Sequence, residues 1–206
     1  MKNIFEYRAI IVDLDGTLYE QRKLRIGMIL KMLRSFWKWK EFLVVYKYHC
    51  LYEQGYNELQ RRMHLPIHAP DIIDEWMIKQ SLPLISKYKD CHLIYLLEKV
   101  MRAGSRVIVY SDYPVNEKLS ALSFRPSEAY SSDDLHCMKP NPSGISRVLK
   151  QAGILPEACL VIGDRYEKDG MLADAMGADF LLLPPGQKKR KKLYNKIEVN
   201  ETKHDR

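Results

Sequence analysis

Long uncharged runs are missing from the sequence of 206 residues, even in its helical stretch between residues 24 and 52. The uncharged segments there fall far short of the roughly 18 residues that a membrane-spanning helix needs. The N-terminal residues, MKNIFEYR, pass at once into an apolar stretch and do not have the pattern of a secretory signal. We therefore expect a cytoplasmic protein that does not cross a bilayer.

Cysteine pairs of the C-x-x-C type are also missing. The four cysteines lie far apart in the sequence, at Cys50, Cys91, Cys137 and Cys159. This spacing does not suit a disulfide framework or a zinc site. We expect reduced thiols that are packed in the protein.

Glycine and proline are not abundant, at ten residues each, and 46% of the residues are hydrophobic. These proportions exclude a disordered body and are typical of a globular protein. The length suits one domain that carries a sizeable insertion. The formal net charge of +7 is spread unevenly: residues 22–48 carry +7, residues 187–206 carry +5, and the remainder carries −5. Two basic segments thus belong to a mildly acidic body.

Short apolar segments alternate with segments of helical spacing beyond residue 90. This alternation, with short turns, is typical of an α/β fold with a right-handed, doubly wound parallel sheet. A run without polar alternation, such as the one that precedes Asp13, suits a central strand buried on both faces. We expect strands at about 9–12, 106–110, 128–131, 160–162 and 180–183, and helices at about 92–103, 115–122, 143–152 and 170–176.

The segment between the first two strands is helical by pattern. No proline occurs before Pro66, and residues 24–52 are predicted to form an amphipathic helix with a basic polar side. Helices are also predicted at about 56–63 and 71–85, and Pro83 should end or kink the second of these. The predicted organisation is an α/β core of residues 1–18 and 91–186, an inserted all-helical domain of residues 19–90, and a basic tail of residues 187–206 that is loose or forms a short frayed helix.

Polar side chains follow three of the predicted strands, where the ligand crevice of an open α/β sheet lies. Neighbouring acids repel unless a cation or a shared proton intervenes, so the sequence predicts a divalent metal, a lysine, or both. Lys139 precedes a proline in an extended turn and could reach the same edge. The polar residues are Asp13, Asp15 and Thr17 after the first strand, Ser111 and Asp112 after the second, and Asp164 and Asp169 after the fourth.

This set of residues resembles the motifs of the haloacid dehalogenase (HAD) superfamily of phosphohydrolases, over nearly the whole chain up to about Leu183. The D-x-D-G-T motif matches residues 13–17, and the hydroxyl residue that ends a hydrophobic strand matches Ser111. The lysine that is followed by Pro-x-Pro matches residues 139–142, and G-D-x-x-x-x-D matches residues 163–169. The resemblance implies a HAD-like Rossmannoid core whose helical insertion is a C1-type cap, a lid over the sheet edge.

The resemblance also implies a role for each acid. Asp13 would be the nucleophile that forms an aspartyl phosphate. Asp15 would protonate the leaving oxygen and then take a proton from the hydrolytic water. One Mg²⁺ would bind the Asp13 carboxylate, the Asp15 backbone carbonyl and Asp164.

The remaining motif residues would hold the substrate and support the metal. Thr17, Ser111 and Lys139 would bind the phosphoryl oxygens. Asp169 would orient metal-bound waters or Lys139 without binding the metal itself. Asp112 departs from the asparagine that many relatives carry, and an acid near a phosphate is unfavourable unless it points away or pairs with a base.

The implied function is hydrolysis of a small organic phosphate monoester by a Mg²⁺-dependent phosphatase. Dehalogenases of the superfamily lack the second aspartate, so Asp15 argues against cleavage of a carbon–halogen bond. A phosphomutase stays open as an alternative because it uses the same acids. A non-catalytic phosphate-binding or membrane-surface adaptor that keeps the fold is a further alternative.

The two basic segments leave open which partners the protein meets. The basic, aromatic cap helix is interpreted either as a packed helix with a solvated face or as a peripheral contact with anionic membrane. The K-K-R-K-K run of the tail could touch nucleic acid or anionic lipid, although a solvated tail is the plainer interpretation. We expect a small phosphorylated substrate and no specific nucleic acid.

Overall fold

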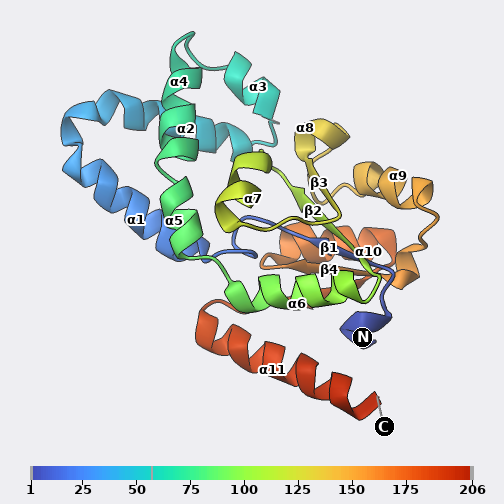
Figure 1. Cartoon of the computed structure of the whole chain (residues 1–206). Coiled ribbons are helices and arrows are strands. Elements are labelled where there is room, and N and C mark those ends of the chain that lie inside the picture. The colour runs from blue at the N-terminus through green and yellow to red at the C-terminus, as the bar shows by residue number, and fades with distance from the viewer. Residues whose placement is uncertain (1, 57, 205–206) are drawn as a thin grey trace.

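Five short strands form one parallel sheet in the computed structural model of the chain, which describes residues 2–56 and 58–204 (Figure 1). The strand order is β3-β2-β1-β4-β5, so the first strand lies at the centre. Its Ile10 pairs with Val107 on one side and with Leu160 on the other. The strands are β1 (Ala9–Val12), β2 (Arg106–Ser111), β3 (Glu128–Ser131), β4 (Cys159–Gly163) and β5 (Asp179–Leu182).

Helices cover both faces of the sheet and enclose two apolar cores. The helices α6 (Cys91–Arg102), α7 (Asn116–Leu122) and α11 (Gln187–His204) contribute buried residues to one core. The helices α8 (Ser132–Leu135), α9 (Ser143–Gln151) and α10 (Met171–Met176) contribute to the other. The doubly wound α/β fold that the sequence predicts is therefore confirmed.

In the described residues of the insertion between β1 and β2, five α-helices precede α6, and they lie together at one end of the molecule (Figure 1). An antiparallel bridge between Tyr19 and Lys89 joins the two chain segments at its base. The insertion has a small core of its own, formed by Val45, Tyr48, Ile73 and Trp76. The helices are α1 (Gln21–Arg34), α2 (Trp39–Glu53), α3 (Glu58–Met63), α4 (Ala69–Ile73) and α5 (Leu82–Lys87).

The prediction of one helix over residues 24–52 is wrong, because the chain turns between α1 and α2. A 3₁₀ turn, Phe36–Lys38, separates the two helices. This turn allows Met28 and Met32 of α1 to pack with Phe42 of α2 around the small core of the insertion. Apolar residues also lie exposed on the outer side of both helices, so neither has the single apolar face that was predicted. Tertiary packing here overrides a helix propensity that is continuous along the sequence.

Pro83 marks the start of a helix and not the end of one. The segment predicted as a helix over residues 71–85 divides into α4, a π-helical turn at Asp74–Lys79, and α5. Pro83 lies in the first turn of α5, where the missing N–H of proline has no cost.

The prediction of a loose or frayed tail is wrong for the part of α11 whose side chains the structure describes. Arg190 and Tyr194 are buried, and α11 lies along α6 (Figure 1). Arg190 donates to the backbone oxygens of Gly16 and Thr17, at 2.5 and 2.9 Å, and forms an ion pair with Asp90 at 3.2 Å. Leu193, Tyr194 and Ile197 of α11 pack against the core at helical spacing, and the polar bonds of Arg190 add to this packing.

Within the described residues, no helix is long and apolar enough to cross a membrane.

Candidate active site

The loop after β1 carries the first two carboxylates of the site. Asp13 follows β1 directly, and its backbone N–H donates to the carbonyl of Ile162 on β4 at 2.9 Å. Gly16 has a φ of +100°, which favours glycine, and a Cβ atom there would collide with the carboxylate of Asp164. The glycine therefore allows the loop after β1 and the end of β4 to bring their carboxylates together.

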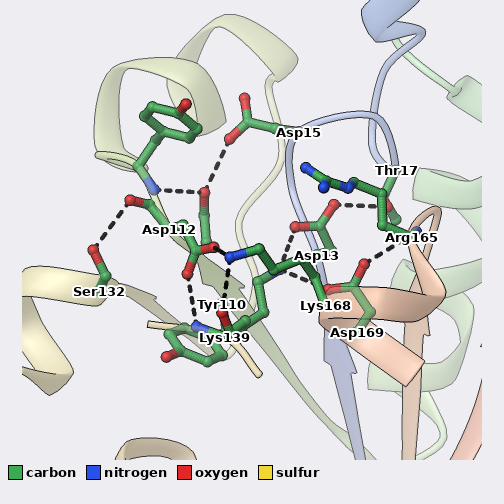
Figure 2. A network of polar contacts seen from close by, with 12 residues as sticks. Asp13, Asp15, Thr17, Tyr110, Asp112, Ser132, Lys139, Arg165, Lys168 and Asp169 are labelled. Atoms are coloured by element: carbon green, nitrogen blue, oxygen red, sulfur yellow. Dashed lines mark hydrogen bonds and ion pairs between the residues drawn. The ribbon is translucent and has the colours of Figure 1, made fainter. Parts of the chain in front are cut away.

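Lys139 is a buried cation between two of the carboxylates. Its Nζ lies 2.5 Å from Asp13 Oδ1 and 2.7 Å from Asp169 Oδ1 (Figure 2). Burial opposes a charge on this ammonium group, but the carboxylates of Asp13 and Asp169 outweigh it and hold the pKa of Lys139 well above its ordinary value. Lys139 is thus a fixed positive charge at the edge of the sheet.

Three carboxylates lie close together beside Lys139 and fit a divalent metal. Oxygens of Asp13, Asp164 and Asp169 lie within 4.8 Å of one another. Burial and then repulsion from Asp169 raise the pKa of Asp164 to about 6, and burial raises the pKa of Asp13 against the attraction of Lys139. The buried Oδ1 of Asp164 has no hydrogen-bond partner among the described residues. Oxygen ligands are those that Mg²⁺ prefers, so the excess negative charge and the unpartnered oxygen suit such an ion.

The carboxylate of Asp15 turns away from this cluster toward the cap. It accepts hydrogen bonds from Ser111 Oγ at 2.9 Å, from Lys118 Nζ at 2.5 Å and from the hydroxyl of Tyr19. Burial opposes ionisation, but the charge of Lys118 and these three hydrogen bonds outweigh it and lower the pKa of Asp15. The two acids of the first motif therefore occupy different environments, with a lysine beside each.

Asp112 lines the same polar hollow as the carboxylate cluster and is paired with a base. Its Oδ1 accepts from the backbone N–H of Lys139 at 2.9 Å (Figure 2). Its Oδ2 accepts from the hydroxyl of Tyr52 at 3.1 Å. Lys168 Nζ lies 3.7 Å from the same Oδ2. Asp112 thus holds the turn that carries Lys139 and joins it to α2 of the insertion.

The two hydroxyl residues of the predicted site are bonded to carboxylates in this structure. Thr17 is fully buried, and its hydroxyl donates to Asp13 Oδ2 at 2.8 Å. Ser111 donates to Asp15 and accepts from the backbone N–H of Tyr113 at 3.1 Å. Ser111 lines this polar hollow together with Asp13, Asp15, Asp164 and Lys139, whereas the buried Thr17 is not part of its lining.

Comparison with known proteins agrees with this geometry. The family model of haloacid dehalogenase-like hydrolases matches residues 10–183, which is most of the chain. This chain belongs to that family. The resemblance stated from the sequence motifs is confirmed, as is the expectation of a HAD-like fold with a helical insertion.

Individual relatives of this HAD-like hydrolase are distant in sequence. It is 22% identical to pyrophosphatase PpaX of Bacillus cereus, over 77% of this chain and 74% of that protein. The structure of CbbY of Rhodobacter sphaeroides in complex with phosphate superposes with a TM-score of 0.59 at 18% identity and 86% coverage of each chain. The structure of YfnB of Bacillus subtilis bound to magnesium gives a TM-score of 0.60 at 12% identity, over 93% of this chain and 99% of the other. These similarities establish the fold.

Several residues of the HAD-like site were not predicted from the sequence, and two of them, Lys118 and Arg190, contact the loop after β1 from distant helices. Lys118 is a single lysine on α7 with no motif around it, and only the packing of α7 beside the loop after β1 brings it to Asp15. Arg190 lies inside a run of basic residues that is typical of a solvated tail, yet it binds the backbone of the same loop. No local signal in the sequence separates either residue from its neighbours.

Proposed function

We propose that this HAD-like hydrolase is a Mg²⁺-dependent phosphatase that hydrolyses a small organic phosphate monoester through an aspartyl phosphate on Asp13. The observation that carries this proposal is the carboxylate cluster of Asp13, Asp164 and Asp169, which has one lysine and an unpartnered buried oxygen. A bound Mg²⁺, held by these carboxylates, would supply positive charge that lets an anionic phosphoryl group approach an anionic nucleophile.

The residues of the chain divide the reaction between them. An oxygen of Asp13 attacks phosphorus, the bond from phosphorus to the alcohol oxygen breaks, and a phosphoryl group is left on Asp13. Lys139, already bonded to Asp13, holds the phosphoryl oxygens as negative charge develops on them. Water then attacks the aspartyl phosphate and releases inorganic phosphate.

Asp15 transfers a proton in each of the two steps. Burial is outweighed by the charge of Lys118, which lowers the pKa of Asp15, so its carboxylate is ionised before substrate binds and the proton for the leaving oxygen must come from the substrate. A phosphate monoester that binds as its monoanion carries a proton that Asp15 can pass to the leaving oxygen, and Asp15 then takes a proton from the attacking water. Tyr19, Ser111 and Lys118 hold the carboxylate in place for both transfers.

A panel of phosphate esters tests the proposal. With Mg²⁺, the protein should release inorganic phosphate from at least one monoester, and EDTA should stop this release until Mg²⁺ is added back. Isomerised sugar phosphate in place of released phosphate would identify a phosphomutase. No turnover on sugar phosphates, nucleotides, phosphoglycolate, lipid phosphates or p-nitrophenyl phosphate would favour a non-catalytic adaptor.

We also propose that the outer side of α1 and α2 rests on anionic membrane. Large apolar residues are exposed there among the basic residues of the segment 22–48, which carries a charge of +7. Such a mixture suits the interface of an anionic bilayer, where apolar side chains enter the headgroup region and basic ones meet lipid phosphates. The exposed apolar residues of α1, of α2 and of the turn between them are Ile26, Ile29, Leu30, Leu33, Phe36, Trp37, Trp39, Leu43 and Tyr46, of which Ile29 and Tyr46 also line a cavity under these helices.

Co-sedimentation with vesicles tests this surface. The protein should bind vesicles that contain phosphatidylserine at low salt, and W37E together with W39E should weaken binding. L155E, which changes an exposed leucine elsewhere on the molecule, is the matched control. An unmodified protein that stays in the supernatant with anionic vesicles would refute the membrane contact.

A further inference from the structure

A cavity of about 470 Å³ lies beneath the helices of the insertion, next to the polar hollow of the active site. Its size is within the range of pockets that hold small ligands. Most of its wall is apolar, and three of the lining residues are methionines. The apolar residues that line the cavity include Met28, Met32, Phe42, Val45, Trp76 and Met77.

The cavity and the polar hollow meet at Asp15. The hollow contains Asp13, Lys139 and Asp164, and Asp15 is a lining residue of both spaces. Lys118, which is bonded to Asp15, lines the cavity at this junction. A phosphate ester whose phosphorus lies beside Asp13 and whose leaving oxygen faces Asp15 therefore has its alcohol portion directed into the apolar cavity.

We infer that the substrate is the phosphate monoester of an apolar alcohol, whose hydrocarbon portion fills this cavity. The inference rests on the proposed phosphatase function, because Asp15 must face the leaving oxygen. Gln21, Arg25 and His49 line both the cavity and the hollow and can meet hydroxyl groups there, but a sugar or nucleoside that extends past them would face mostly apolar side chains. Hydroxyl groups without partners in that space are unfavourable. A hydrocarbon chain has no such groups, and its transfer from water to the apolar wall of the cavity is favourable.

The shape and composition of the cavity suit a flexible chain that extends to the surface. Methionine side chains adapt to irregular apolar ligands because they are unbranched and have several rotatable bonds. Ile29 and Tyr46 line the cavity and are also 54% and 69% exposed, so the cavity opens between α1 and α2. A chain longer than the cavity can leave through this opening.

A homologous series of soluble alkyl phosphates tests the inference in the absence of membranes. We expect kcat/KM to rise from ethyl to octyl phosphate, by roughly fourfold for each methylene group that becomes buried, and to exceed the value for glucose 6-phosphate. A flat series, or a preference for the sugar phosphate, would overturn the inference while leaving the phosphatase intact.

Two methionine variants test whether the preference for longer alkyl chains arises in this cavity. M32Q places an amide in the cavity wall and should reduce the preference for octyl over ethyl phosphate. M63Q makes the same change at a methionine of the insertion that is 76% exposed and does not line the cavity, and it should leave the preference unchanged. Equal preferences in the two variants would contradict the assignment of this cavity.

A binding measurement separates failure of this inference from failure of the proposed function. In the D13N variant, which cannot form the aspartyl phosphate, calorimetry should show that octyl phosphate binds more tightly than ethyl phosphate, and that M32Q removes the difference. This result supports the cavity even if no hydrolysis is found with any ester. Equal binding of the two phosphates would overturn the inference whatever the activity.

Discussion

The edge of the sheet and the cavity of the insertion form two halves of one site with opposite character. At the edge, buried charged groups hold one another, as Lys139 does with Asp13 and Asp169. In the cavity, apolar side chains from α1, α2 and the turn after α4 form most of the wall. The difference indicates that the chemistry and the choice of substrate are located on separate parts of the chain. Changes at the edge should therefore reduce the rate with every substrate, whereas changes in the cavity should reorder the substrates.

The largest expected effect is at the edge of the sheet. D13N should lower kcat by roughly 10⁴-fold or more for every substrate, because an amide cannot serve as the nucleophile. D71N, at an exposed carboxylate of α4, is the control and should retain full activity. Phosphate release by D13N at a rate near that of the unmodified protein would refute the role of Asp13.

The next largest effect is expected on stability, when Arg190 of α11 is replaced. R190M should lower the free energy of unfolding by about 3–5 kcal/mol, because it removes the cation that is paired with buried Asp90 and bonded to the loop after β1. K191M changes an exposed lysine beside it and should have little effect. Urea unfolding measures both, and equal midpoints for the two variants would contradict a structural role for Arg190.

A smaller effect on activity is expected at the junction of the two halves. K118M should lower kcat by about 100-fold with little change in KM, because it removes the charge that holds Asp15 in position. K118R keeps the charge and should recover part of the loss. If K118M raises KM and leaves kcat unchanged, Lys118 binds substrate and does not position Asp15.

The smallest effect tests how firmly the insertion is joined to the core. Y52F removes the hydrogen bond from α2 to Asp112 and should cost about 0.5–1.5 kcal/mol of stability. Y95F changes an exposed tyrosine on α6 and should cost less. Thermal unfolding compares the two variants, and equal stability would show that the bond to Asp112 contributes nothing measurable.

The sequence predicts the two halves unequally well, for physical reasons. Strands buried on both faces have continuous apolar runs, and the ends of parallel strands meet at one edge, so the convergence of Asp13, Ser111 and Asp164 could be predicted before the structure was known. The turn between α1 and α2 could not, because no proline or glycine marks it and only packing around the small core of the insertion favours it.

Single side chains that contact a loop from a distant helix also could not be predicted from the sequence. Lys118 and Arg190 come from helices far along the sequence from the loop that they contact. In the insertion, apolar residues occur on both the inner and outer sides of α1 and α2, so periodicity does not tell which of them line the cavity. The chemistry of the site is thus predictable from motifs, while its substrate pocket depends on tertiary packing.

The central claim is that Asp13 carries the phosphoryl group during turnover, and acid quenching of a single turnover tests it most directly. After proteolysis, mass spectrometry should find one phosphoryl group on the peptide that contains Asp13, and the D13N variant should have none. Phosphate release by the unmodified protein with no phosphoryl group on this peptide, or with the group on another residue, would contradict the account.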